Sequence, residues 1–239
     1  MVAPSGPAPV PQTGFAALTP QPLFGGAMTA ALPRAMTSVA LLRQIPDNQE
    51  VFASQGAEDT SVIIELTEPA ATAPGQLPAV WHFHELAELN DARGADAMLM
   101  HQLAAFPSDV IGIQDAAAAA SRVAAALPFP ASAYSFAVGT QRIAKFNEQA
   151  KNVVAVLVAV IRLADVETDV VVTYHVPTVL DPASSSAAAV AAAATSGEAA
   201  ALSSPSPALA LAPDLQAAWS TFLALVASVR VLDYGLFGA

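Results

Sequence analysis

The sequence predicts an α+β fold in which a mostly antiparallel β-sheet carries helices on both of its faces. Two nearly continuous apolar runs, 153–163 and 169–176, lie close together in the chain, and such runs are typical of strands covered on both faces. The segment 214–232 has the spacing of an amphipathic helix. Strands buried on both faces need a covering layer on each side, so a helix–sheet–helix sandwich is the economical architecture.

The strands are expected in the following places. Residues 61–66 are short, apolar and β-branched, and residues 134–144 alternate imperfectly between apolar and polar side chains. The segment 164–168, which contains Asp165 and Glu167, has the composition of a turn. The runs on either side of it are therefore expected to form an antiparallel hairpin at the centre of the sheet, with Pro177 ending the second strand.

Three helices are expected. Pro213 and Asp214 suit the first turn of the helix predicted over 214–232. Its apolar face is formed by Leu215, Trp219, Phe222, Leu223 and Val226. Residues 81–90 are a weaker candidate, and the alanine-rich segment 114–127 is helical on propensity alone.

Two low-complexity segments stand out from the folded part, one at the N-terminus and one within the predicted domain. Residues 1–22 are rich in Pro, Ala and Gly and carry no charge, which predicts a disordered arm. Residues 23–239 are expected to form a single domain. Within it, 183–212 is predicted to be an Ala/Ser-rich surface insertion, in which 187–194 has helical propensity.

Composition excludes several classes of function. The chain has 239 residues, with 20 acidic against 9 basic side chains and a net charge of −11. This balance argues against a nucleic-acid partner and favours a basic protein partner. There is no cysteine, so thiol nucleophiles, disulfides and Cys-based zinc sites are excluded. The apolar run from 153 to 161 is too short to span a membrane, which takes about 20 residues.

Catalytic motifs are not found in the sequence. It contains neither a P-loop nor a G-x-S-x-G nucleophile elbow. His82 and His84 would share a face in a strand, with Glu85 or His175 as an imaginable third ligand, but this is too little to predict a metal site. Asp165, Glu167 and Asp169 are expected on a solvated turn. We therefore expect no catalytic residue, no metal and no cofactor.

One short motif, Pro46-Asp47-Asn48-Gln49-Glu50-Val51-Phe52, carries more information. The proline restricts the entry conformation, and Asp47 and Asn48 favour a turn. In a helical turn, Asp47 and Glu50 would point the same way, while Val51 and Phe52 would anchor the segment in the core. The residue types alone favour a structural loop in which Asp47 caps a turn and Glu50 is solvated.

This motif, preceded by Leu23-Phe24-Gly25-Gly26-Ala27 and Leu32-Pro33, resembles the signature segments of the Mog1 family. Four further segments resemble that family in the same order along the chain. They are residues 61–68, 81–90, 159–172 and 236–238. The resemblance covers about 23–177 and 213–238, and the arm and the insertion lie outside it.

The resemblance implies a sandwich similar to the PsbP fold and a non-enzymatic protein that binds the GTPase Ran, favours its nucleotide-free form and so releases GTP in nuclear protein import. It implies that the acidic loop residues, here Asp47 and Glu50, contribute to Ran binding, with Arg43, Asn48 and Gln49 as neighbours. We expect a monomer in nucleus and cytoplasm, without nucleic-acid binding or membrane insertion. Asp47→Lys with Glu50→Lys is expected to abolish Ran binding and leave the thermal melt nearly unchanged.

Three alternatives stay open. A PsbP-like photosystem subunit would share the fold, but it would need an Arg-rich transit peptide, and residues 1–22 contain no Arg. An adaptor or trafficking protein could use the same surface for another partner. A metal hydrolase could be built on His82 and His84, and metal in the purified protein would reveal it.

Overall fold

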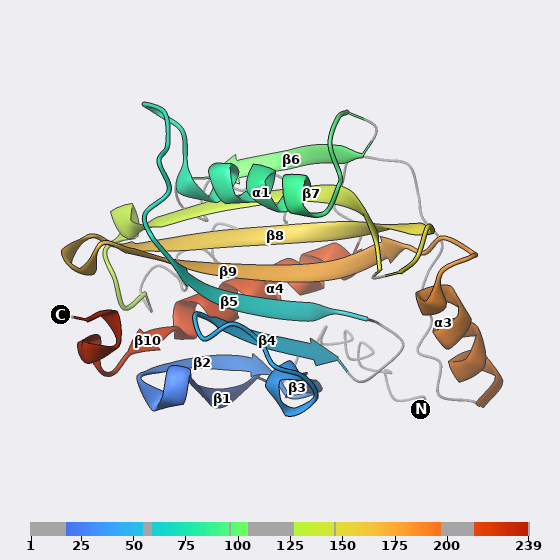
Figure 1. Ribbon diagram of the computed structural model, residues 1–239, viewed down its shortest axis with the longest axis horizontal. Helices are drawn as coiled ribbons and strands as arrows, with labels where there is room; N and C mark the ends of the chain where they lie inside the picture. The colour runs from blue at the N-terminus through green and yellow to red at the C-terminus, as the bar shows by residue number, and fades with distance from the viewer. Residues whose placement is uncertain are drawn as a thin grey trace, which may run out of the picture.

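The computed structural model describes residues 18–54, 59–95, 97–104, 127–145, 147–196 and 213–238, and shows two antiparallel sheets (Figure 1). The large sheet has the strand order β3-β4-β5-β9-β8-β7-β6, and the small sheet has the order β1-β2-β10. The strands of the large sheet are β3 (Met36–Ser38), β4 (Gln49–Ser54), β5 (Ser61–Thr67), β6 (Met98–Ala104), β7 (Tyr134–Ala144), β8 (Lys151–Leu163) and β9 (Thr168–Val179). Those of the small sheet are β1 (Leu18–Leu23), β2 (Met28–Pro33) and β10 (Arg230–Val231).

The predicted central hairpin is confirmed by the pairing of β8 with β9. Its turn contains a 3-10 helix, η5 (Ala164–Val166), followed by Glu167 in the left-handed region at φ 46°. The prediction that Pro177 ends the second strand is wrong. Pro177 pairs with Val154 at a register shift, and β9 continues to Val179. A bulge tolerates proline because the ladder hydrogen bonds are already interrupted there.

Asp169 does not lie on a solvated turn as expected. Its side chain is 0% exposed and forms an ion pair with the partly exposed side chain of Arg162, its cross-strand partner. Arg162 donates from Nε to Oδ1 at 2.8 Å and from Nη2 to Oδ2 at 2.7 Å, and the Ala70 N–H donates to Oδ2 at 2.9 Å. These bidentate hydrogen bonds offset the free-energy cost of removing the carboxylate from water.

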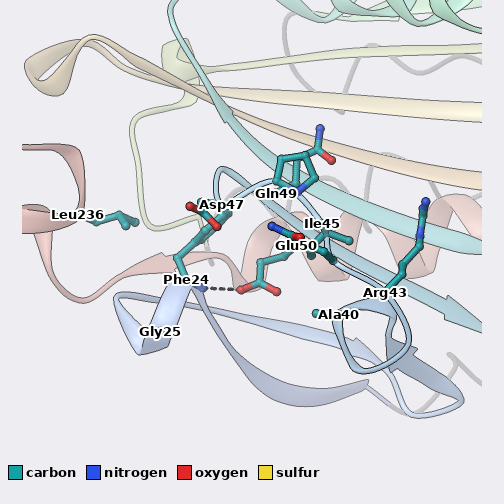
Figure 2. A pocket seen from close by; sticks show the side chains of 11 residues that line it. Phe24, Gly25, Ala40, Arg43, Ile45, Asp47, Gln49, Glu50 and Leu236 are labelled. Carbon is teal, nitrogen blue, oxygen red and sulfur yellow. Dashed lines mark hydrogen bonds between the residues drawn. The ribbon is translucent and has the colours of Figure 1, made fainter.

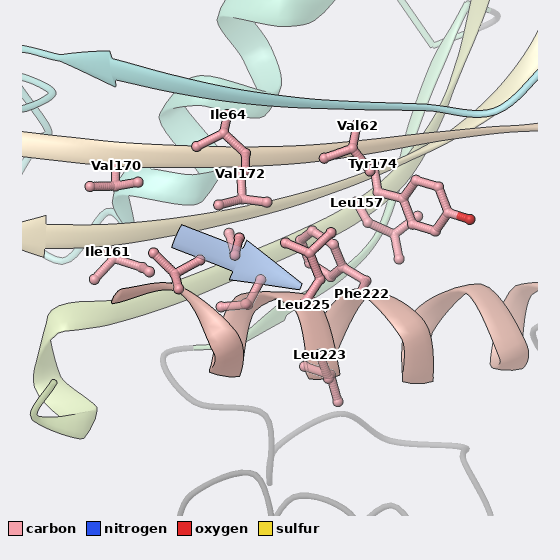
Figure 3. Close-up of a cluster of buried hydrophobic side chains, with 14 of the residues drawn as sticks. Val62, Ile64, Leu157, Ile161, Val170, Val172, Tyr174, Phe222, Leu223 and Leu225 are labelled. Atoms are coloured by element: carbon pink, nitrogen blue, oxygen red, sulfur yellow. The ribbon is translucent and has the colours of Figure 1, made fainter. Parts of the chain in front are cut away.

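Helices cover both faces of the large sheet, as predicted (Figure 1). Helix α1 (Pro78–Leu89) packs against β7 and β8, where Phe83 is fully buried. Helix α4 (Pro213–Ser228) packs with β2 against the opposite face, and the cluster in Figure 3 joins Phe222 and Leu225 to Leu157 and other side chains of the sheet. Helix α4 ends before residue 232 because Arg230 and Val231 pair with β2.

The predicted arm is too long at its C-terminal end, because residues 18–22 belong to strand β1. Pro20 and Pro22 concealed this strand from sequence reasoning. They are tolerated because β1 is at the edge of the small sheet, where a missing N–H interrupts no central ladder. Residues 1–17 lie outside the described residues, as does the predicted helix at 114–127 except for Leu127.

The Ala/Ser-rich segment contains a helix, α3 (Ser185–Ser196), which includes the stretch with helical propensity. It is fastened at its start, where the Ser186 hydroxyl donates to Asp59 Oδ2 at 2.8 Å and accepts from Asn152 Nδ2 at 3.2 Å. The rest of the predicted insertion, 197–212, is outside the described part of the chain. Among the described residues, no helix is both long and apolar enough to cross a membrane.

Candidate functional site

The loop that connects β3 to β4 carries most of the predicted site residues. It begins with a 3-10 helix, η2 (Val39–Leu41), and ends in a tight turn where the Gln49 N–H donates to the Pro46 carbonyl at 3.0 Å. Val51 and Phe52 are 9% and 5% exposed and anchor the following strand in the core, as predicted. The loop is therefore held at both ends by elements of the large sheet.

An open cleft of about 460 Å³ lies beside this loop (Figure 2). Four of the five predicted residues line it, namely Arg43, Asp47, Gln49 and Glu50. Phe24 and Gly25 line it from η1 (Phe24–Gly26), and Leu236 lines it from η6 (Tyr234–Phe237). Three motifs that are far apart in the sequence thus converge on one cleft.

Glu50 connects two of these motifs. Its Oε1 accepts a hydrogen bond from the Phe24 N–H at 2.7 Å (Figure 2). Phe24 has φ 49°, and Gly25 and Gly26 follow at 66° and 94°, so three successive residues occupy the left-handed region. That conformation is costly for Phe24, which has a Cβ atom. The carboxylate of Glu50 stabilises the turn by accepting its first N–H.

The structure differs from both readings of Glu50. It lies in strand β4 rather than in a helical turn with Asp47, and it is partly buried rather than solvated as in the alternative structural loop. Asp47 occupies the predicted turn and is exposed. A double charge reversal at both positions should therefore lower the melting temperature, because lysine at position 50 removes the acceptor for Phe24.

Asn48 and Gln49 form hydrogen bonds that stabilise the pairing of β4 with β5. Gln49 Nε2 donates to Glu65 Oε1 at 2.8 Å, and Asn48 Nδ2 donates to the Leu66 carbonyl at 3.0 Å. Both contacts brace β4 against β5, and Asn48 does not line the cleft. Sequence reasoning missed Glu65, which is the cross-strand partner of Gln49; only the alternation of β5 hints that its side chain shares the face of Gln49.

The cleft offers charged and polar groups to a partner. Among the described residues that line it, Asp47, Glu50 and Arg43 carry the charges, and none is a His, Ser or Lys. Such a site can pair with basic and polar groups of a partner. The two histidines considered as metal ligands both lie on helix α1 but on different sides of it. His82 is buried beside Asp169, with 3.8 Å between Nε2 and Oδ2, whereas His84 is exposed. The residues that the structure describes contain no metal-binding group of three or more His, Asp or Glu side chains.

Fold and site together thus define this chain as an α+β protein with an open acidic cleft. The family model described as "Ran-interacting Mog1 protein" matches residues 21–177, and the chain belongs to the Mog1 family. It is 36% identical over 166 residues to a Ran guanine nucleotide release factor of Danio rerio, covering 70% of this chain and 82% of the relative.

Other relatives agree with this assignment. The nuclear import protein mog1 of Schizosaccharomyces pombe is 34% identical over 158 residues, covering 65% of this chain and 75% of the relative. The crystal structure of the Saccharomyces cerevisiae Ran-binding protein Mog1p superposes with a TM-score of 0.57 at 21% identity, covering 92% of this chain and 98% of that one. The structural match confirms the predicted fold class.

Proposed function

We propose that this chain binds the GTPase Ran and promotes release of its guanine nucleotide, acting in nuclear protein import. The observation that carries the proposal is the convergence of the Leu23-Phe24-Gly25-Gly26 and Asp47–Glu50 motifs and Leu236 on one acidic cleft. Relatives of this chain are named Ran guanine nucleotide release factor and nuclear import protein, and the family model covers the first two of these motifs. The chain acts without covalent chemistry, as a monomer, in the nucleus and the cytoplasm.

The charge of the cleft suits this task. A GTPase holds its phosphates with a lysine, backbone N–H groups and Mg²⁺, and these contacts order its switch segments. A carboxylate docked nearby competes with the phosphates for the lysine or repels them. Asp47 is the exposed carboxylate able to reach a partner, whereas Glu50 also holds the Phe24 turn. Because coupling is reciprocal, bound nucleotide must weaken binding of this protein by the same factor.

The test is the release of a fluorescent GTP analogue from Ran during titration with this protein. We expect the wild type to accelerate release and Asp47→Lys to abolish the acceleration, with an unchanged melt because Asp47 is exposed. Glu85→Lys is the matched control, since Glu85 is exposed on α1 away from the cleft. Absence of both binding and acceleration by the wild type would overturn the proposal.

A further inference from the structure

Two adjacent leucines stand almost entirely in solvent beside the cleft. Leu41 is 78% exposed and Leu42 is 85% exposed. Single exposed apolar residues are ordinary on protein surfaces, but two consecutive large aliphatic side chains next to a candidate binding site form a contiguous apolar feature. The two leucines contribute little to the stability of the fold, because neither belongs to a core cluster of the described residues.

The backbone presents these leucines in a fixed position. Leu41 ends η2, and the Leu42 and Arg43 N–H groups both donate to the Val39 carbonyl, at 2.9 and 3.1 Å. The 3-10 helix η2 itself packs against β4. A side chain on an ordered turn loses less conformational freedom on binding than one on a mobile loop.

The leucines are also continuous with the cleft. Ala40 precedes them and Arg43 follows them, and both of these flanking residues line the cleft. A partner that places basic groups against Asp47 and Glu50 therefore reaches the apolar pair with the same surface. A few side chains that become fully desolvated contribute most of the affinity at protein interfaces, whereas rim charges mainly affect association rate and specificity.

We propose that Leu41 and Leu42 are the docking anchor of this protein on Ran, inserting into an apolar depression next to the basic groups that the acidic cleft meets. This inference rests on the proposed function and assigns separate tasks within it. The leucine pair sets the affinity, and the carboxylates of the cleft drive nucleotide release.

The test compares the double variant Leu41→Ala/Leu42→Ala with Leu89→Ala. Leu89 is the matched control because it is 81% exposed but lies at the end of α1. Binding to fluorescently labelled nucleotide-free Ran gives Kd, and a titration of nucleotide release gives the half-saturating concentration and the plateau rate. We expect the double variant to raise Kd and the half-saturating concentration about tenfold or more, with unchanged plateau rate and melting temperature. Leu89→Ala should match the wild type in all four quantities.

Three results would overturn the inference. In the first, the double variant binds Ran with the Kd of the wild type. In the second, its plateau rate falls while Kd stays the same, which would place the leucines in the release step. In the third, sedimentation shows a wild-type dimer that the double variant dissociates without a change in Kd, so that a second copy covers the pair. A wild type that binds Ran without accelerating release would contradict the proposed function alone, because the Kd comparison would still decide the role of the leucines.

Discussion

Removing the carboxylate of Glu50 should destabilise a turn that is distant from it in sequence. In Glu50→Ala the Phe24 N–H loses the acceptor that now lies 2.7 Å away. The turn would then keep its left-handed Phe24, with φ 49°, without the contact that offsets its cost. Glu50→Gln retains an amide oxygen as acceptor and removes only the charge, so the pair of variants separates hydrogen bonding from electrostatics.

The magnitude follows from the kind of bond and its burial. A hydrogen bond to a charged group contributes about 1.5–3 kcal/mol, and the lower part of that range applies because Glu50 is only partly buried. We therefore expect Glu50→Ala to cost about 1.5–2 kcal/mol, which for a domain of this size lowers Tm by about 3–8 °C. A neutral hydrogen bond is about half as strong, so Glu50→Gln should cost about 1 kcal/mol.

Thermal unfolding followed by circular dichroism measures the stabilities, and nucleotide release from Ran measures the function. Glu50→Ala should lose stability and release activity together, whereas Glu50→Gln should lose release activity at a smaller loss of stability. A Glu50→Ala protein that melts within about 1 °C of the wild type would refute a stabilising role for this bond.

Three further predictions concern the same turn and two ionisable groups of the sheet, His175 and Asp169. Gly25→Ala should lower the free energy of unfolding by about 1 kcal/mol, because Gly25 has φ 66° although space for a Cβ is open, and chemical denaturation at constant pH measures it. Burial lowers the pKa of His175 from 6.5 to about 4. The unfolded chain alone binds this proton between those values, so stability should fall by about 3 kcal/mol as pH drops from 6.5 to 4, and His175→Gln should flatten this part of the profile. Burial raises the pKa of Asp169, but hydrogen bonds from Arg162 and the Ala70 N–H and the charge of Arg162 outweigh it and lower that pKa from 3.8 to about 2. A second loss of about 2 kcal/mol should therefore follow below pH 3.8, and urea denaturation across the pH range would contradict both assignments if stability stayed level.

Four strands of the large sheet, β5, β7, β8 and β9, could be predicted from the sequence, because the central ones are buried on both faces and read as apolar runs, whereas β3, β4 and β6 have no such pattern. Residues 134–144 were assigned with the bounds that β7 has, and the β8–β9 hairpin was assigned with small errors at its ends. Strand β1 was missed because edge strands accept Pro20 and Pro22, so its composition resembles a disordered segment. The burial of Asp169 was missed because its partners Arg162 and Ala70 come from other strands and loops.

For the candidate site, the residues could be predicted from the sequence, but the separate role of each residue could not. Asp47 and Glu50 are three positions apart in one motif, yet the turn before β4 leaves Asp47 in solvent and the strand directs Glu50 toward Phe24. That contact spans 26 positions of sequence and depends on the packing of the small sheet next to β4, so no local pattern could reveal it. It makes the glycine-rich turn and the acidic motif one physical unit, because a change in either alters the backbone that lines the cleft. A double charge reversal therefore cannot separate binding from folding, whereas a change at Asp47, which is exposed and outside the turn's hydrogen bond, tests partner binding without disturbing the turn.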